Sequence, residues 1–187
     1  DMATTDVQDT RQAAALSIFE ICDLEWLAAN APKPADRSAA AVFRFLIGCC
    51  ARFDDGKHIR NPIPQESEAT VEVVNIQTKT TGRMKPVKTQ PLIAPKMEFT
   101  SMLPRIPSNA ETQPFLLEYG IPTNVSEDSV HQVRRPWWRE LVRSQTAFSA
   151  HHPDRDFLLP LPNKGRTGFV RSPIKNNQAL RWLRDLI

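Results

Sequence analysis

Hydrophobic residues recur every three or four positions along the first fifty residues, a spacing typical of helices that bury one face. Between residues 7 and 30 the recurring positions are Leu16, Phe19, Cys22, Trp26 and Leu27. Between residues 36 and 53 they are Val42, Leu46, Cys49, Cys50 and Phe53. Prolines 32 and 34 separate the two stretches, and Asp36 is of a type that caps a helix N-terminus. The pattern therefore predicts a helical hairpin.

The pattern changes to strand-forming residues at 71–79, which read VEVVNIQTK. Residues 80–83 can turn the chain back into a partner strand over 87–93, so we expect a β-hairpin after a polar loop at 54–68. Pro91 and Pro95 cannot donate to a strand ladder. The second strand is therefore expected to be short or to lie at a sheet edge, and proline-rich extended chain should follow over 97–123.

The last third returns to helical spacing. A helix is expected from about Ser126, and Pro136 either kinks it or stands in the first turn of a new helix. Residues 151–171 read as a loop with a short strand at 157–159. Ser172 and Pro173 then signal the start of a last helix that runs to the end of the sequence. Its predicted apolar side consists of Leu180, Leu183, Leu186 and Ile187.

These elements define an α+β protein with an N-terminal helical hairpin, a central β-hairpin or small antiparallel sheet with Pro-rich extended segments, and C-terminal helices. The 187 residues suit one domain. Within it we expect a helical part at 1–55, a strand and Pro-rich part at 56–125, and a basic helical part at 126–187. Sixteen prolines against six glycines support a middle that is poor in long helices.

Charge is unevenly distributed along the chain, although the net charge is only +3. Residues 1–80 hold 8 lysines and arginines against 12 acidic residues, and residues 131–187 hold 11 against 4. A basic segment attracts phosphate backbones or acidic protein surfaces. The acidic first half and the basic last third also permit head-to-tail self-association or internal pairing, and the sequence leaves these open.

Arginines and tryptophans alternate over 131–143 (HQVRRPWWRELVR), a composition that suits nucleic-acid binding because guanidinium groups pair with phosphates and exposed rings stack on bases. Trp137 falls on the apolar line of the predicted helix and is expected in the core. Trp138 falls off that line and is the candidate for an exposed stacking ring. The candidate contact residues here are Arg134, Arg135, Trp138, Arg139 and Arg143.

A second basic stretch, 163–171 (NKGRTGFVR), has two glycines three residues apart, which allow a backbone to approach a phosphate closely. It matches neither the P-loop nor the dinucleotide fingerprint. Lys164, Arg166 and Arg171 are its candidate contact residues. An ordinary solvated turn is the alternative for this loop, as an ordinary arginine-rich helix face is for 131–143.

No cofactor or metal site is expected. The metal-ligand types at 151–156 (HHPDRD) have no second cluster with recognisable spacing, and the three cysteines lie in apolar stripes, where we expect buried, reduced thiols. Asp55, followed by a strand that ends Gln77-Thr78-Lys79, resembles the Asp then Glu/Gln-x-Lys arrangement of some restriction-type nucleases. Glutamine stands here in place of the acidic member, which puts metal binding in doubt.

Three functions follow from these observations, in this order. The first is a non-catalytic binding module that contacts DNA or RNA backbone through a basic C-terminal surface. The second is a protein–protein assembly subunit, with an acidic protein surface or a second copy as its partner. The third is a metal-dependent nuclease. No apolar run approaches the roughly 20 residues that cross a bilayer, and residues 1–9 lack a basic signal-peptide start, so an intracellular protein, cytoplasmic or nuclear, without a membrane partner is expected.

Overall fold

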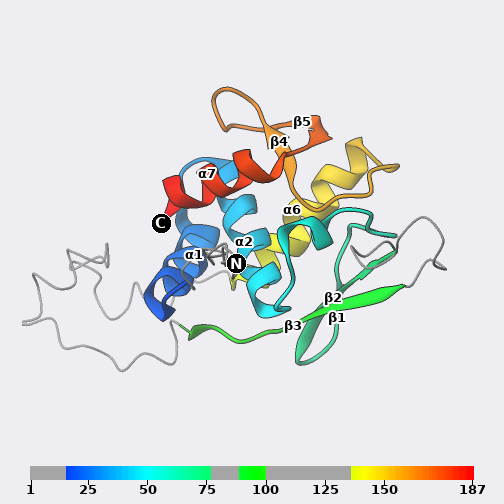
Figure 1. Ribbon diagram of the computed structural model, residues 1–187, viewed down its shortest axis with the longest axis horizontal. Helices are drawn as coiled ribbons and strands as arrows, with labels where there is room; N and C mark the ends of the chain where they lie inside the picture. The colour runs from blue at the N-terminus through cyan, green and yellow to red at the C-terminus, as the bar shows by residue number, and fades with distance from the viewer. Residues whose placement is uncertain (1–15, 77–88, 100–135) are drawn as a thin grey trace, which may run out of the picture.

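The computed structural model describes residues 16–76, 89–99 and 136–187. Its helices are α1 (Ile18–Asn30), α2 (Pro34–Gly48), the short 3-10 helix η1 (Phe53–Gly56), α6 (Trp137–His151) and α7 (Asn176–Leu186). Its strands are β1 (Gln65–Glu66), β2 (Thr70–Asn75), β3 (Gln90–Pro95), β4 (Pro160–Pro162) and β5 (Phe169–Pro173). Helices at both ends of the chain and small antiparallel sheets confirm the α+β class (Figure 1).

Helices α1 and α2 form the predicted hairpin. A capping box starts α1, because Ser17 Oγ accepts from Glu20 N and Glu20 Oε2 accepts from Ser17 N. Pro34 occupies the first turn of α2, after Lys33. The prediction that Asp36 caps α2 is wrong. Its side chain is buried within the first turn and accepts instead from Trp182 Nε1 at 2.8 Å.

Helix α2 ends at Gly48, five residues before the predicted Phe53, because the backbone of Cys50 turns into the left-handed region with φ 51°. The turn is a Schellman motif, in which Ala51 N donates to Leu46 O and Cys50 N donates to Ile47 O, both at 2.9 Å. Cys50 is exposed and Cys49 is partly buried, so the expectation that all three thiols are buried is confirmed for Cys22 and wrong for Cys50.

Helix α2 is the centre of the protein, since α1, α6, α7 and β3 all pack against it (Figure 1). Eleven of its fifteen residues are buried, including Val42 and Phe45. The described part of the chain shares one apolar cluster, which runs from Leu24 through α2 and the sheet to Trp182.

Strands β2 and β3 pair antiparallel, which confirms the predicted hairpin, with β1 on the other side of β2. Lys96 N donates to Ala69 O at 2.8 Å, so even-numbered residues of β3 face β2 and residues 91, 93 and 95 turn their backbone groups outward. Two of these outward positions are Pro91 and Pro95, which have no N–H. The free edge of β3 is therefore poorly suited to pairing with another strand.

Chain segments far apart in the sequence extend this sheet region. Ile59 N donates to Asp156 O at 2.7 Å, and Ile76 N donates to His58 O at 2.9 Å. Residues 57–60 thus lie between the end of β2 and the segment 156–158. Phe157 pairs with Lys57, as the predicted short strand at 157–159 suggested, although the longer pairing is between β4 and β5.

The C-terminal helices differ from expectation in where α7 begins and in which of its side chains face the core. Helix α6 begins directly after Pro136, which is its N-cap, and the predicted helical stretch 126–135 lies outside the described residues. Helix α7 begins at Asn176, since Ser172 and Pro173 end strand β5 instead. The predicted apolar side of α7 is right for Leu183 and Leu186, which pack against the core, and wrong for Leu180 and Ile187, which are exposed. Ala179 and Trp182 are the buried residues of this helix.

Candidate nucleic-acid interface

The two tryptophans at the start of α6 face the protein. Trp137 is fully buried and donates from Nε1 to Met97 O at 3.2 Å. Trp138 is partly buried and packs against the core, with its ring meeting that of Trp137 edge-on at 5.8 Å between centroids and 89° between planes. Trp138 is therefore not the freely exposed ring that stacking on bases would require.

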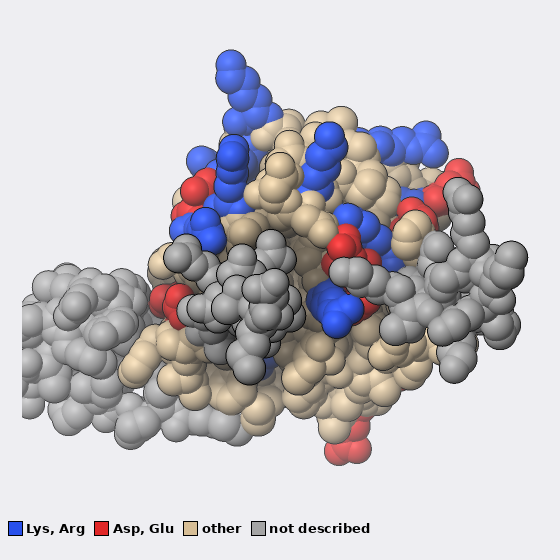
Figure 2. Space-filling view, in the orientation of Figure 1, with Lys and Arg blue, Asp and Glu red and all other residues tan. Residues whose placement is uncertain are grey.

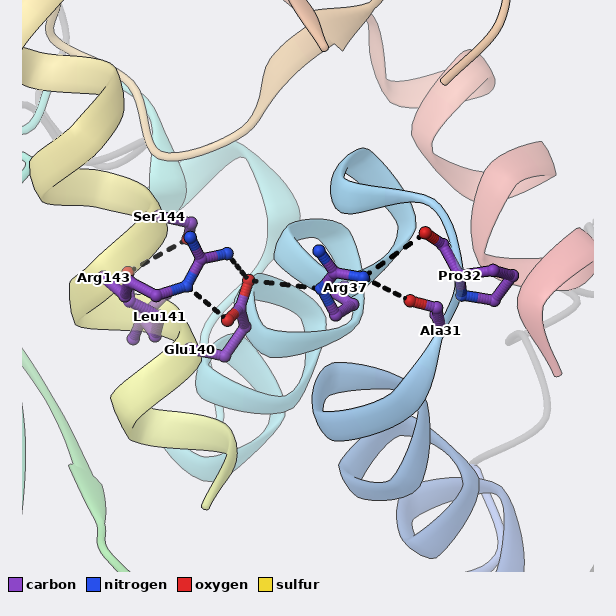
Figure 3. A network of polar contacts seen from close by, with 7 residues as sticks. All are labelled: Ala31, Pro32, Arg37, Glu140, Leu141, Arg143 and Ser144. Carbon is purple, nitrogen blue, oxygen red and sulfur yellow. Dashed lines mark hydrogen bonds and ion pairs between the residues drawn. The ribbon is translucent and has the colours of Figure 1, made fainter. Parts of the chain in front are cut away.

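Arg143 is held by a buried carboxylate on its own helix. Its Nε donates to Glu140 Oε2 at 2.8 Å and its Nη2 donates to Glu140 Oε1 at 2.5 Å. Figure 3 shows Arg37 of α2 pointing at the same carboxylate, with Nε 4.0 Å from Oε1, while its Nη1 donates to Ala31 O at 2.6 Å. One buried anion thus joins two arginines and links α6 to α2.

This network changes what Arg143 can contribute. A buried carboxylate requires charge and hydrogen-bond partners, and these bonds to Glu140 raise the pKa of Arg143. About half of the Arg143 side chain is still exposed. Its positive charge is nevertheless offset by Glu140, so Arg143 adds little to the field outside the protein.

Arg166 also has internal partners. Its Nη2 donates to Asp185 Oδ2 at 2.8 Å, its Nη1 lies 3.6 Å from Asp36 Oδ1, and its guanidinium lies over the ring of Trp182 at 5.8 Å. Its backbone has φ 55°, and its carbonyl accepts from Ala35 N at 3.2 Å. Arg166 fastens the β4–β5 loop to α2 and α7, so internal pairing of the acidic and basic parts does occur here.

The remaining predicted cations are more available. Arg139 and Lys164 are exposed and form no ion pair with a carboxylate of the described residues. The Arg171 side chain is 67% exposed, with Asp154 at 3.9 Å, itself highly exposed. Arg134 and Arg135 lie outside the described residues.

The structure adds three cations that the sequence interpretation missed. Lys175, the N-cap of α7, and Arg181 and Arg184 on α7 are exposed and have no carboxylate partner within the described ranges. Arg181 and Arg184 are three residues apart and so lie on one side of the helix. Burial of Ala179 and Trp182 explains why these arginines are exposed, because the opposite side of the helix must then face outward. We define the basic surface as Lys164, Arg171, Lys175, Arg181 and Arg184.

Figure 2 shows where positive side chains gather on one face of the protein. Lysines and arginines stand out over the upper part, where Figure 1 places β4, β5 and α7, and few acidic side chains lie among them. Residues 136–187 hold nine lysines and arginines against four acidic residues. Two of those four, Glu140 and Asp185, are engaged by Arg143 and Arg166.

One arginine of this region is buried and serves the fold. Arg155 donates from Nη2 to Gln145 O at 3.0 Å and from Nη1 to Phe157 O at 2.9 Å. Burial lowers the pKa of Arg155 to about 10, so it stays protonated at neutral pH. Arg155 Nη2 also donates to Ser149 Oγ at 3.0 Å, so Arg155 ties the segment 155–158 to the C-terminal half of α6.

The groups that would support an enzyme do not form a centre among the described residues. Asp55 uses its carboxylate to accept from Arg52 N at 2.8 Å, at the start of η1. Its carbonyl accepts from Asn75 Nδ2 at the end of β2, but Gln77 and Lys79 lie outside the described ranges. Within those ranges no three His, Cys, Asp or Glu side chains are grouped to hold a metal ion.

A small cavity between α2, η1 and the segment 157–159 is apolar and offers no binding chemistry of its own. Its empty volume is about 210 Å³ including space open to solvent, below the roughly 300 Å³ at which ligand pockets begin. Its lining is Val42, Leu46, Phe53, Gly56, Lys57, Phe157, Leu158 and Leu159. The apolar side chains that line it pack together as part of the hydrophobic core.

Comparisons with protein-family models, with curated proteins and with solved structures found no match for this chain. The described helices include none with the length and apolar character needed to cross a bilayer.

Proposed function

We propose that this protein is a non-catalytic module that binds nucleic acid through the basic surface, mainly by contacts to phosphate. The observation that carries the proposal is the group of exposed cations in the β4–β5 loop, on β5 and along α7 with its N-cap. Among the described residues only Arg171 of this group has a carboxylate within 4 Å, that of the highly exposed Asp154. Cations that are already paired gain little from a phosphate, whereas solvated ones can replace its counterions. Arg139 on α6 is a further exposed cation without an ion pair to a carboxylate of the described residues.

The other predicted contact residues support this surface indirectly. Arg166 holds the β4–β5 loop against α2 and α7 and so fixes the position of neighbouring Lys164. Arg143 pairs with the buried Glu140 of its own helix, and Trp138 packs against the core beside Trp137. Phosphate contacts without an exposed stacking ring fit binding that depends weakly on sequence.

The test is fluorescence-anisotropy titration of labelled single- and double-stranded DNA and RNA across a salt series. The proposal predicts binding at low salt that weakens steeply as salt rises, because phosphate contacts release counterions. An affinity that does not change with salt concentration would contradict phosphate contacts. Negligible binding of every probe, even at the lowest salt, would overturn the proposal and turn the search to a protein partner.

The second candidate function, a protein-assembly subunit, is favoured by a different observation. Val170 and Leu180, each 47% exposed, lie on the same elements as the basic surface. Exposed aliphatic side chains gain little from a phosphate backbone but can be buried against another protein. A mass in solution that rises with concentration, without any nucleic-acid binding, would favour this function over the first.

A further inference from the structure

Two helices of this protein present outer faces of opposite charge that both carry exposed apolar side chains. The large exposed apolar residues of the described ranges are Ile18 and Trp26 on α1, Ile93 on β3, Val170 on β5, and Leu180 and Ile187 in or just beyond α7. Both α1 and α7 use their inner sides to pack on α2 (Figure 1). Their outer sides are thereby left facing away from the core.

The outer face of α1 is acidic. Helix α1 contains Glu20, Asp23 and Glu25 and has no lysine or arginine. Glu25 is buried with Arg44, so the outer charges are those of Glu20 and Asp23. Partial burial, then the charge of Glu20, raises the pKa of Asp23, and no lysine or arginine of the described residues forms an ion pair with it. Trp26, 43% exposed, lies one turn from Asp23.

The outer face of α7 is the basic counterpart. Leu180, Arg184 and Ile187 recur at i, i+4 and i+7 and so form one stripe, with Arg181 beside it. Leu180 and Ile187 are 47% and 37% exposed. The acidic residue of this helix, Asp185, is engaged by Arg166. The face thus combines two aliphatic side chains with two positive charges.

We propose that the outer face of α1 in one copy of this chain packs on the outer face of α7 in a second copy. Trp26 would lie against Leu180 and Ile187, and Asp23 and Glu20 would face Arg181 and Arg184. Tryptophan is among the residues that contribute most to protein interfaces, and an arginine beside it adds a cation–π contact. Each copy carries both faces, so two copies can make the contact twice in a two-fold pair.

This contact uses Arg181 and Arg184 of the basic surface, so nucleic acid and a second copy would compete for α7, and the contact is tested without nucleic acid. Sedimentation equilibrium over a concentration series should show the wild-type mass rising from 21.2 kDa towards twice that value. Trp26→Lys alters only the α1 face and Leu180→Asp only the α7 face, so each variant alone should remain at the mass of one chain. Ile93→Asp, an equally exposed apolar position outside both faces, is the matched control and should behave as wild type.

Mixing the two variants gives the decisive result. Trp26→Lys keeps an intact α7 face and Leu180→Asp keeps an intact α1 face, so an equimolar mixture should form pairs that neither variant forms alone. A charge exchange provides a second check: Asp23→Arg and Arg184→Asp should each weaken association, and the double variant should restore it. A wild-type chain of constant single mass, or a mixture that stays at the mass of one chain, would overturn the inference.

Discussion

Arg44 of α2 donates a hydrogen bond from Nε to Glu25 Oε1 of α1 at 2.8 Å, and both side chains are buried. The same carboxylate oxygen accepts from Phe99 N at 3.0 Å, and Arg44 Nη2 donates to Met97 O at 2.8 Å. The guanidinium lies 5.0 Å from the rings of Phe99 and Trp137. One ion pair therefore joins α1, α2, the chain after β3, and α6.

Replacing Arg44 by methionine should destabilise the protein by about 3–5 kcal/mol, because it leaves the buried Glu25 carboxylate without its cation. The double variant Arg44→Met/Glu25→Gln should lose clearly less, since no buried charge then remains unpaired. Urea unfolding of the wild type and both variants measures the difference. A double variant less stable than Arg44→Met would show that the charge of Glu25 is not the cause.

Replacing Cys50 by glycine should stabilise the protein. Its left-handed backbone costs about 1 kcal/mol for a residue with a Cβ, and glycine is the preferred residue at this position of a Schellman turn. Cys50→Gly is therefore expected to raise the free energy of unfolding by about 1 kcal/mol. Cys50→Ala, which loses the thiol but keeps Cβ, is the control. Equal stability of the two variants would contradict strain at this residue.

The adjacent thiols should differ in reactivity. Burial, followed by the neighbouring Cys50, raises the pKa of Cys49 to about 12, so its reactive thiolate appears only as the pH approaches that value. In native protein at pH 8, iodoacetamide should modify exposed Cys50 well before Cys49 or buried Cys22. Tandem mass spectrometry of the labelled peptide locates the adduct, and equal labelling of Cys49 and Cys50 would contradict the described burial.

Arg143 and Lys164 should contribute unequally to nucleic-acid binding. Because Glu140 already offsets Arg143, Arg143→Gln should lower affinity by less than half as much, in free energy, as Lys164→Gln. The same Arg143→Gln change should cost roughly 1–3 kcal/mol of stability, since it removes hydrogen bonds from a buried acceptor. Anisotropy titrations and urea unfolding of both variants give the two numbers. A larger loss of affinity for Arg143→Gln than for Lys164→Gln would show that Arg143, not Lys164, is the main phosphate contact of the two.

The elements set by local sequence were predictable. The α1–α2 hairpin follows from apolar spacing and from the prolines between the helices, and the β2–β3 hairpin follows from β-branched residues. Pro91 and Pro95 correctly indicated an edge strand, because a missing N–H excludes a central position. These features depend on short stretches of chain, so the sequence carries them directly.

The phase of α7 was not predictable in this way. Apolar residues occupy positions 179, 180, 182, 183, 186 and 187, which leaves more than one candidate inner face. Contact with α2 decides between them, because Trp182 Nε1 reaches Asp36 across 146 residues of chain. A contact between residues so far apart in the sequence produces no periodic pattern of apolar residues.

The sequence predicted which part of the chain carries the candidate site, but it did not predict all of the residues that form it. The basic C-terminal third and its loop at 163–171 are where the exposed cations lie. Which cations are paired depends on distant residues: Arg166 meets Asp36 of α2, and Glu140 lies near Arg37. Trp138 was expected on the outside because it leaves the apolar line, yet its ring finds a place beside Trp137.

The central claim is that exposed cations of α7 contact phosphate, and the most direct measurement is the salt dependence of duplex DNA binding for Arg181→Gln/Arg184→Gln. The control is Arg52→Gln/Arg60→Gln, which removes two exposed arginines from outside the basic surface. Each lost phosphate contact reduces the slope of log K against log salt by about 0.9. The α7 variant should therefore show a slope smaller in magnitude by about 1.8, with the control slope unchanged. Equal slopes for the two variants would contradict the basic surface as the site of binding.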